Sequence, residues 1–379
     1  LVKGLLDAVG NYGWAVVLFT VILKIITLPL DFWQRFSMKK NAKMMSELAP
    51  IMAKLDKAYA NDKNKLNQEK QKLYKKHGYN MLSGCLPMIV TMTIFFVMFG
   101  GLNQCSAYVN LKVYSELSVH YTDTLSAELS KHTEEYESKR YDILLSGKST
   151  AIEDYKTWLG GQGVAESAFD AEISAATSRI SQIKAEAQAE ARKAVGEFYL
   201  EAKEGFLWIT NISRPDTWVE SFPETAEKFT GTLTKKYRAY KDEFDSELYG
   251  EIYKGISEQG VGYKVGDKHW NGLMILPVLS IALSFLSTFI SNKTSKKKNE
   301  EEQQLDPNAA AAQSSNKVMM FVMPVIMGVF GFVYTATFAL YMVCSSLLSI
   351  LFTLAMNPII DRRIAKIESK VEKPDYRRK

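Results

Sequence analysis

Long apolar runs without charge alternate along this chain with segments that are rich in charge. Residues 86–102 and 270–291 contain no Asp, Glu, Lys or Arg, and neither does the stretch 318–360. A helix needs about 20 apolar residues to cross a bilayer, so the last stretch is long enough for two crossings. The run at 11–30 has the same character and carries one charge, Lys24. The pattern predicts five membrane-spanning helices, at 11–30, 86–104, 269–291, 318–334 and 336–356.

The segments between these runs show mainly helical periodicity. Residues 31–85 predict a basic cytoplasmic hairpin of two helices, broken at Asn61-Asp62. Residues 105–268 predict a helical extracytoplasmic domain, and we expect no β-domain there because alternating β-branched runs are absent. The predicted fold class is an all-α membrane protein. It is completed by a cytoplasmic linker at 292–317 and a basic tail at 357–379.

Charge decides the expected orientation. The net charge is only +5, but residues 31–85 carry 12 Lys and Arg against 5 Asp and Glu, and residues 357–379 carry 8 against 4. Residues 105–268 carry 20 against 28. Because basic loops stay in the cytoplasm, we expect the N-terminus outside and the C-terminus in the cytoplasm. The apolar runs exclude a disordered chain, and the spans that interrupt the basic segments disfavour a nucleic-acid-binding protein.

Lys24 is the charge inside the first apolar run. A charge at such depth costs roughly 2.5–3.5 kcal/mol on insertion scales, so it usually faces protein or water. Snorkelling of the lysine toward the lipid headgroups is the alternative. Steps of three and four residues place Lys24 on the polar face of its helix, together with Gly13, Val17, Thr20, Thr27 and Asp31. This shared face favours a position enclosed by protein.

Weaker polar stripes mark two other spans. The fifth span carries a weak polar stripe of Tyr341, Ser345, Ser349 and Phe352 on one face, and the third span carries Ser280, Ser284, Ser287 and Thr288. Stripes of this kind serve helix packing more often than they line a channel. The sequence shows no nucleophile constellation, acid–base pair, phosphate loop or metal-ligand spacing. We therefore expect no enzyme, no cofactor and no metal.

Four stretches together resemble one known family. NYGWAVVLFTVILKIITLPL at 11–30 and KVMMFVMPVIMGVFGF at 317–332 are similar to two of its core spans. GFLWITNISRPD at 205–216 is similar to its motif before the third span, and the basic hairpin followed by Gly-Cys-Leu-Pro at 84–87 is the most specific likeness. The family is that of the YidC-type membrane protein insertases. Because the large β-sandwich domain of Gram-negative members is missing, the chain looks like a divergent, Gram-positive-like bacterial member with a long extracytoplasmic insert.

The resemblance implies a multi-pass protein of the bacterial plasma membrane with a hydrophilic groove among its spans. It places Thr20 and Lys24 in this client-binding groove, although the family usually has Arg at the position of Lys24. Thr27 and Tyr341 are added from the helix faces described above. Met342 replaces an aromatic residue that the family uses for client contact. The segments 105–204 and 219–268 have no counterpart in the family core.

The function that the resemblance implies is a membrane protein insertase or chaperone. It would pass client transmembrane helices and short acidic tails through the groove into the bilayer without a nucleotide. The expected partners are nascent membrane proteins, as clients, and anionic lipids. A ribosome, a Sec-type channel and an unknown partner of the outer domain are further candidates. The chain is expected to be a monomer. The alternatives are a membrane-anchored scaffold or docking protein and a solute transporter. A transporter would need inverted repeats or a broken midplane helix, which the sequence does not show.

The outer region contains one narrow apolar stripe. Ile173, Ile180, Ile183 and Ala187 follow one another at spacings of 7, 3 and 4 within the helical stretch 165–205. Such a stripe suits pairing with a second helix. Its expected intramolecular partner is either 111–145 or 224–258.

Overall fold

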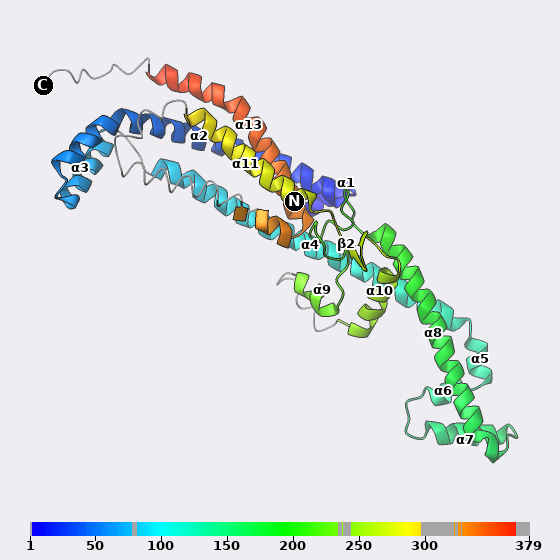
Figure 1. The fold of residues 1–379 in the computed structure, drawn as a ribbon. Helices are drawn as coiled ribbons and strands as arrows, with labels where there is room; N and C mark the ends of the chain where they lie inside the picture. The colour runs from blue at the N-terminus through cyan, green and yellow to red at the C-terminus, as the bar shows by residue number, and fades with distance from the viewer. Residues whose placement is uncertain are drawn as a thin grey trace. The chain divides into compact units, whose positions relative to one another are not determined.

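The computed structural model shows a mainly helical chain (Figure 1). The chain forms two compact units. Unit 1 comprises Leu1–Ser106, Phe206–Trp218 and Gly272–Lys379, and unit 2 comprises Ala107–Gly205 and Val219–Asn271. The structure describes residues 2–77, 82–233, 237, 244–296, 322, 325–326 and 328–368. The expectation of an all-α fold is confirmed apart from one short hairpin of strands.

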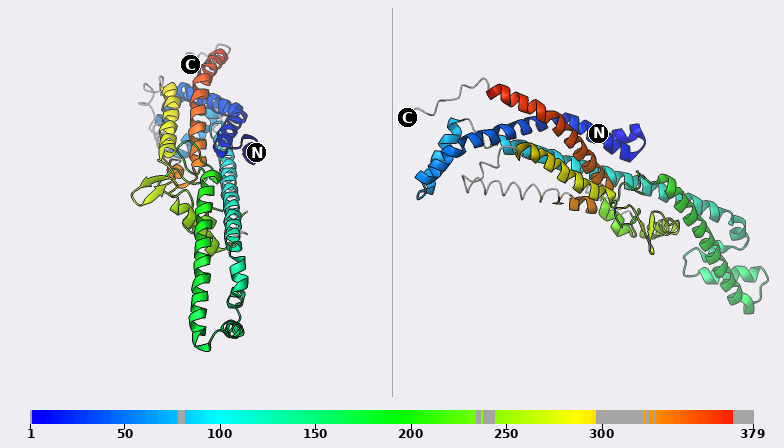
Figure 2. Two further views of the ribbon diagram at one scale, coloured as in Figure 1. Left: turned by 90° about the vertical axis from the view of Figure 1, so that its right-hand side faces the viewer. Right: turned by 45° about the horizontal axis from the view of Figure 1, so that its top comes forward.

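Unit 1 is built from long helices. They are α1 (Val2–Val9), α2 (Tyr12–Ala58), α3 (Lys63–Lys76), the first part of α4 (Leu82–Ser130), α11 (Ile275–Lys296) and α13 (Ala336–Glu368). Helix α2 begins where Asn11 caps it, because the Asn11 side chain accepts a hydrogen bond from the backbone N–H of Trp14 at 3.2 Å. Helices α2 and α11 both pack against α13, so the three run side by side (Figures 1 and 2).

Three helices of the described residues are long and apolar enough to cross a membrane. They are Tyr12–Asn41, Met92–Ser130 and Ala336–Ile367, and Ile275–Ile290 is a shorter apolar helix. The three correspond to the first, second and fifth predicted spans, and the shorter one to the third. The fourth predicted span, 318–334, lies largely outside the described residues, although 328–333 are helical. The chain is a multi-pass membrane protein, and the number of five spans stays a prediction.

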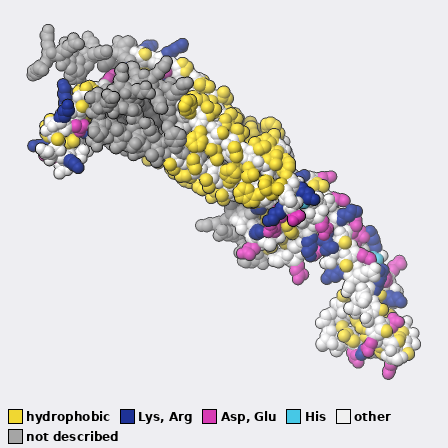
Figure 3. All heavy atoms as spheres, in the orientation of Figure 1, with side chains coloured by type: hydrophobic (Ala, Val, Ile, Leu, Met, Phe, Trp, Pro, Cys, Tyr) yellow, Lys and Arg dark blue, Asp and Glu magenta, His cyan; other side chains and the backbone are white. Residues whose placement is uncertain are grey.

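The outer surface of these helices is apolar. Large hydrophobic side chains are exposed along them, including Ile26 at 68%, Val97 at 72% and Val333 at 65%. Figure 3 shows hydrophobic side chains gathered over the middle part of the helices of unit 1, with charged side chains at the end where α3 lies, and charged side chains of both signs across the surface of unit 2. A soluble protein rarely exposes so large an apolar surface, so these side chains face lipid.

Two helices continue past the ends that the apolar pattern suggests. Helix α2 runs through Pro29 to Ala58, and α13 runs through Pro358 to Glu368. A proline removes one backbone donor but does not force a helix to end when neighbouring elements hold both sides of it. Such contacts exist here, because Lys39 of α2 forms an ion pair with Asp361 of α13 at 2.8 Å.

The end of α2 and helix α3 form a helical hairpin. Asp62 caps α3 by accepting a hydrogen bond from the backbone N–H of Lys65 at 3.0 Å, which explains the predicted break at this point. Lys70 of α3 forms an ion pair with Asp56 of α2 at 2.7 Å. Met52 of α2 is buried, and the Tyr74 hydroxyl contacts its sulfur at 3.3 Å. The hairpin is thus held by packing as well as by charge.

Unit 2 is organised around the long helix α8 (Phe169–Ala202). In the apolar stripe predicted on this helix, Ile180, Ile183 and Ala187 are buried. Both expected partners contact it. Helix α10 (Ser246–Glu258) packs along it, and Arg179 of α8 binds Glu135 of α5 (Thr133–Ser138). The remaining short elements are α6 (Tyr141–Leu144), α7 (Ala151–Gly161), η1 (Glu166–Ala168) and α9 (Ala226–Thr232).

Helices α8 and α10 cross at two glycines. A Cβ added to Gly196 would overlap the carbonyl oxygen of Gly255, and one added to Gly255 would overlap the carbonyl oxygen of Arg192. The absent side chains let the two backbones touch. Arg192 closes the crossing with a 2.7 Å ion pair to Glu251 of α10. Beside it lies an aromatic core of stacked and tilted rings, made by Tyr114, Phe222, Phe229, Phe244 and Tyr249.

A two-stranded sheet interrupts the helical pattern of unit 2. Strands β1 (Tyr263–Val265) and β2 (Lys268–Trp270) are antiparallel, with Lys264 opposite His269. Gly266 begins the two-residue turn with φ of +62°, a conformation that suits glycine. With three residues per strand the hairpin is too short to produce the alternating pattern by which strands are recognised in a sequence.

Residues 206–218, predicted as part of the outer region, belong to unit 1 and tie two of its helices together. The buried Asp216 carboxylate accepts hydrogen bonds from the backbone N–H groups of Leu273, Met274 and Leu276 at 2.8–3.1 Å, at the start of α11, and from the indole of Trp208 at 3.1 Å. The start of α13 is held in the same way, since Thr337 donates through both its N–H and its hydroxyl to the carbonyl oxygen of Ile212.

Candidate functional site

A polar cavity of about 410 Å³ lies among the apolar helices of unit 1. Helix α2 contributes most of its polar lining, and α13, α11 and α4 complete it. The lining residues are Leu23, Lys24, Thr27, Asp31, Gln34, Arg35, Ile94, Phe95, Ser287, Tyr341 and Ser349. The structure therefore brings together three of the five residues predicted for the groove, Lys24, Thr27 and Tyr341.

The helical period explains why α2 supplies so many of these groups. Lys24, Thr27, Asp31 and Arg35 follow at steps of three, four and four residues, so they lie on one helix face. The sequence pattern identified this face as far as Asp31. Continuing the same step by four residues would have found Arg35, but it lies beyond the predicted span end at 30 and was counted with the hairpin.

Lys24 is paired inside the cavity. Its ammonium lies 3.1 Å from Oδ2 of Asp31, and the two side chains are 17% and 18% exposed. Seven residues correspond to about 10 Å along a helix, so both side chains reach toward each other over Thr27. A partly buried cation is tolerated in a span when a carboxylate lies beside it. This contact favours the protein-enclosed position of Lys24 over snorkelling.

Some residues of the two weaker polar stripes serve helix packing, and others line the cavity. Ser280 is buried and donates to the carbonyl oxygen of Pro277 at 2.8 Å, and Ser284 of α11 contacts Ser346 of α13 at 3.4 Å. These serines serve packing within and between helices. One or two turns farther along the same helices, Ser287 and Ser349 line the cavity. On α11 the packing serines precede the lining residue Ser287, whereas on α13 the lining residues Tyr341 and Ser349 lie on either side of Ser346 in the sequence.

Two predicted groove residues lie outside the lining. Thr20 is fully buried and donates its hydroxyl to the carbonyl oxygen of Val16 at 2.7 Å. Met342 is half-buried and follows Tyr341 on α13, but only Tyr341 lines the cavity. Their assignment to the groove rests on the family resemblance, whereas the cavity itself begins one helical turn after Thr20.

The cavity is closed on the side of Thr20. Tyr12, Ala15 and Val16 have no exposed surface, and the Tyr12 hydroxyl contacts Ser106 at 3.2 Å. Leu102 and Thr337 are equally buried in the same layer. The first part of α2 is thus packed tightly against α4 and α13, while the part from Leu23 to Arg35 borders open space.

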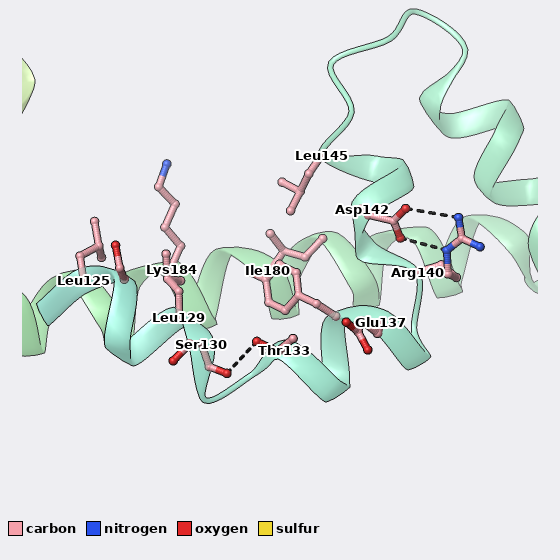
Figure 4. Close-up of a pocket in the computed structure, with 12 residues that line it drawn as sticks. Leu125, Leu129, Ser130, Thr133, Glu137, Arg140, Asp142, Leu145, Ile180 and Lys184 are labelled. Atoms are coloured by element: carbon pink, nitrogen blue, oxygen red, sulfur yellow. Dashed lines mark hydrogen bonds and ion pairs between the residues drawn. The ribbon is translucent and has the colours of Figure 1, made fainter. Parts of the chain in front are cut away.

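A second cavity, of about 730 Å³, lies in unit 2 (Figure 4). Leu125, Leu129, Leu145 and Ile180 give it an apolar wall, and the Arg140–Asp142 ion pair stands at its edge. A hollow of this kind is expected where short helices meet a long one, and we assign no ligand to it. Among the described residues, no group of three or more His, Cys, Asp or Glu could hold a metal ion.

Residues 4–145 and 193–363 match the family described as 60Kd inner membrane protein. The matched residues include all described residues that line the polar cavity. They also include 105–145 and 193–268, so the family likeness extends into the outer region beyond the stretches that the motifs indicated. Residues 146–192 lie outside the match.

Three proteins that are similar to this chain carry the same name. A Helicobacter pylori protein named Membrane protein insertase YidC is 42% identical over 99 residues, which cover 26% of this chain and 17% of that protein. Proteins of the same name from Fusobacterium nucleatum and Caldanaerobacter subterraneus are 44% and 40% identical over 96 and 100 residues, covering 25% and 26% of this chain. The matches span 45% and 47% of those two proteins, less than half of their length.

Proposed function

Since the chain belongs to the 60Kd inner membrane protein family, we propose that it is a membrane protein insertase that passes client segments through the polar cavity of unit 1. The observation that carries this proposal is the cavity itself, which places Lys24, Thr27, Asp31, Arg35 and Tyr341 among lipid-facing helices. Ionisable groups inside membrane-spanning helices are costly, and a polar pathway is one of the functions they commonly serve. The name shared by its relatives supports the same function.

The cavity would lower the barrier for a polar client tail. Moving a tail with charged groups across about 30 Å of hydrocarbon is costly, and a wet cavity within the membrane shortens that distance. The packed layer of Tyr12, Val16 and Thr20 closes one end of the cavity and would prevent leakage of ions. The other end, near Arg35, is where the basic hairpin begins and where a client would enter from the cytoplasm.

Release into lipid would follow from burial of the client helix. Once the tail has crossed, the apolar client segment leaves the polar cavity and moves along the exposed apolar helices into the bilayer. The transfer of apolar surface out of water supplies the driving force. The mechanism therefore needs no nucleotide.

The expected surroundings follow from the same proposal. The chain lies in a bacterial plasma membrane with its N-terminus outside, and nascent membrane proteins are its clients. The basic hairpin and tail face anionic headgroups, which attract Lys and Arg by about 1 kcal/mol each. A ribosome or a Sec-type channel would contact the same cytoplasmic segments, and unit 2 would contact a partner outside.

Complementation tests the proposed function. The chain is expressed in a bacterium depleted of its own insertase, and growth and insertion of a short membrane protein are measured. We expect both to be restored. Lack of rescue by a chain that is present in the membrane at the level of the native insertase would contradict the proposal. A variant lacking 146–192 separates the rival scaffold function, since an insertase keeps activity without this segment and a scaffold built on unit 2 loses it.

A further inference from the structure

Asp31 occupies the position that an acidic client would need. It lies at the polar cavity 3.1 Å from the Lys24 ammonium, and both side chains are more than four-fifths buried. The described lining holds two cations, Lys24 and Arg35, and one anion, Asp31. The family resemblance places Lys24 in a groove that takes acidic tails, and the structure shows that the charge of Lys24 is compensated by Asp31.

We propose that Asp31 is an internal competitor that determines which client tails the cavity accepts. This inference rests on the proposed insertase function. A tail with a single carboxylate exchanges one carboxylate for another at Lys24 and gains little. A tail with several carboxylates can displace Asp31 from Lys24 and, with a further carboxylate, compete for Arg35, which has contacts of its own in the protein. The preferred clients are therefore short polypeptide tails with two or more acidic residues, and Asp31 sets this threshold.

The physical basis is the low exposure of the pair. Between exposed groups in water, one charge more or less changes affinity little. In a cavity bordered by apolar helices the same charge acts through a lower dielectric, so Asp31 reduces the attraction felt by any incoming carboxylate. Removal of Asp31 would leave two cations in the described lining and no anion.

Insertion into vesicles tests the threshold. The full chain is reconstituted in vesicles of neutral lipid, and three clients are compared that differ only in a tail carrying no, one or three Glu among Gln residues. For the wild type we expect equal insertion of the first two clients and about fivefold more of the third, which is the upper end of the range measured for single exposed ion pairs. In Asp31→Asn the client with one Glu should also rise about fivefold, and Asp31→Glu should restore the threshold. Asp7→Asn, on the exposed surface of α1, is the matched control.

A structural role for the pair gives a different result. If Asp31 only holds Lys24 in place, Asp31→Asn lowers insertion of all three clients equally, and the inference is wrong. A wild-type chain that already distinguishes one Glu from none overturns it without any variant. Failure of the proposed function gives a different result. If no client is inserted more than in vesicles without the protein, the chain has no insertase activity. In that case binding of a four-glutamate peptide to the purified chain still tests Asp31. Asp31→Asn should tighten binding about fivefold, and unchanged binding refutes the competitor role.

Discussion

At the scale of single residues, the charge of Lys24 distinguishes the cavity from an ordinary helix contact. Lys24→Ala removes the cation that an acidic tail meets beside Asp31. We expect insertion of a client with three acidic tail residues to fall about fivefold, which is the advantage that the acidic residues give it in the wild type, and Lys24→Arg to retain it. Insertion in vesicles measures both, with Lys40→Ala, an exposed lysine of α2, as control. Equal activity of the Ala and Arg variants at low and high salt would indicate snorkelling instead.

Asp216 is the residue on which the start of α11 depends. Its carboxylate is fully buried and accepts three backbone N–H groups and one indole N–H. Asp216→Asn replaces one accepting oxygen by a donor and loses about two of these bonds, a cost on the order of 3 kcal/mol. We expect a lower melting temperature of the purified chain. Asp7→Asn should leave the melting temperature unchanged, and an equal loss in both variants would show that Asp216 has no special role.

Acidity affects the contact between α5 and α8. Arg179 donates two hydrogen bonds to Glu135, at 2.8 and 3.0 Å, and holds the pKa of this carboxyl below its usual value. The contact therefore stabilises α5 fully above the ordinary glutamate pKa of about 4.3 and is lost as the pH falls through the lowered pKa. The protection of α5 amides against hydrogen exchange, taken relative to the intrinsic exchange rate at each pH, should fall in that acidic window in the wild type. Glu135→Gln should show this lower protection already at neutral pH, and Glu134→Gln, an exposed neighbour, should resemble the wild type.

At the scale of helices, the crossing of α8 and α10 depends on glycines rather than on the predicted apolar stripe alone. Gly255→Ala would drive a Cβ into the carbonyl oxygen of Arg192 and separate the helices, at a cost of about 1–3 kcal/mol. Gly250→Ala on the same helix meets nothing within 4 Å and should stabilise the helix by about 0.5–1 kcal/mol. Thermal melts of the two variants should shift in opposite directions. A shift in the same direction would contradict the close crossing.

Periodicity predicted what lies on one helix and missed what depends on distant contacts. The steps of three and four residues placed Lys24, Thr27 and Asp31 on one face, and the structure shows all three at the cavity. The sequence predicted a span at 11–30 followed by a hairpin helix that breaks at Asn61-Asp62, whereas the structure joins both in α2, and the end of α13 was predicted too early. Lys39 and Asp361, which pair the two helices beyond the apolar runs, are 322 positions apart. The hydrogen bonds between Asp216 and the start of α11 could not be predicted for the same reason, because they join residues about 60 positions apart.

At the scale of the whole molecule, the side from which a client enters depends on the orientation inferred from charge. Residues 31–85 are expected in the cytoplasm because they are the most basic segment. A single cysteine at position 65, in the helical hairpin, should resist an impermeant thiol reagent in intact cells and react after the cells are opened. Cysteine at position 152, in unit 2, should react in intact cells. The reverse result would invert the orientation and place the packed layer of the cavity on the cytoplasmic side.

The passage of clients through the cavity is tested most directly by site-specific crosslinking during insertion. A photoreactive residue replaces Tyr341, which lines the cavity, or Val97, which is 72% exposed on the outer surface of α4. The client carries a bulky folded domain directly after its tail, which halts it during insertion. The halted client should be crosslinked at position 341, and the crosslinked yield should be higher in the wild type than in Lys24→Ala. Capture at position 97 should appear only after release of the halted client. Early capture at position 97 with none at 341 would show that clients enter the bilayer without passing through the cavity.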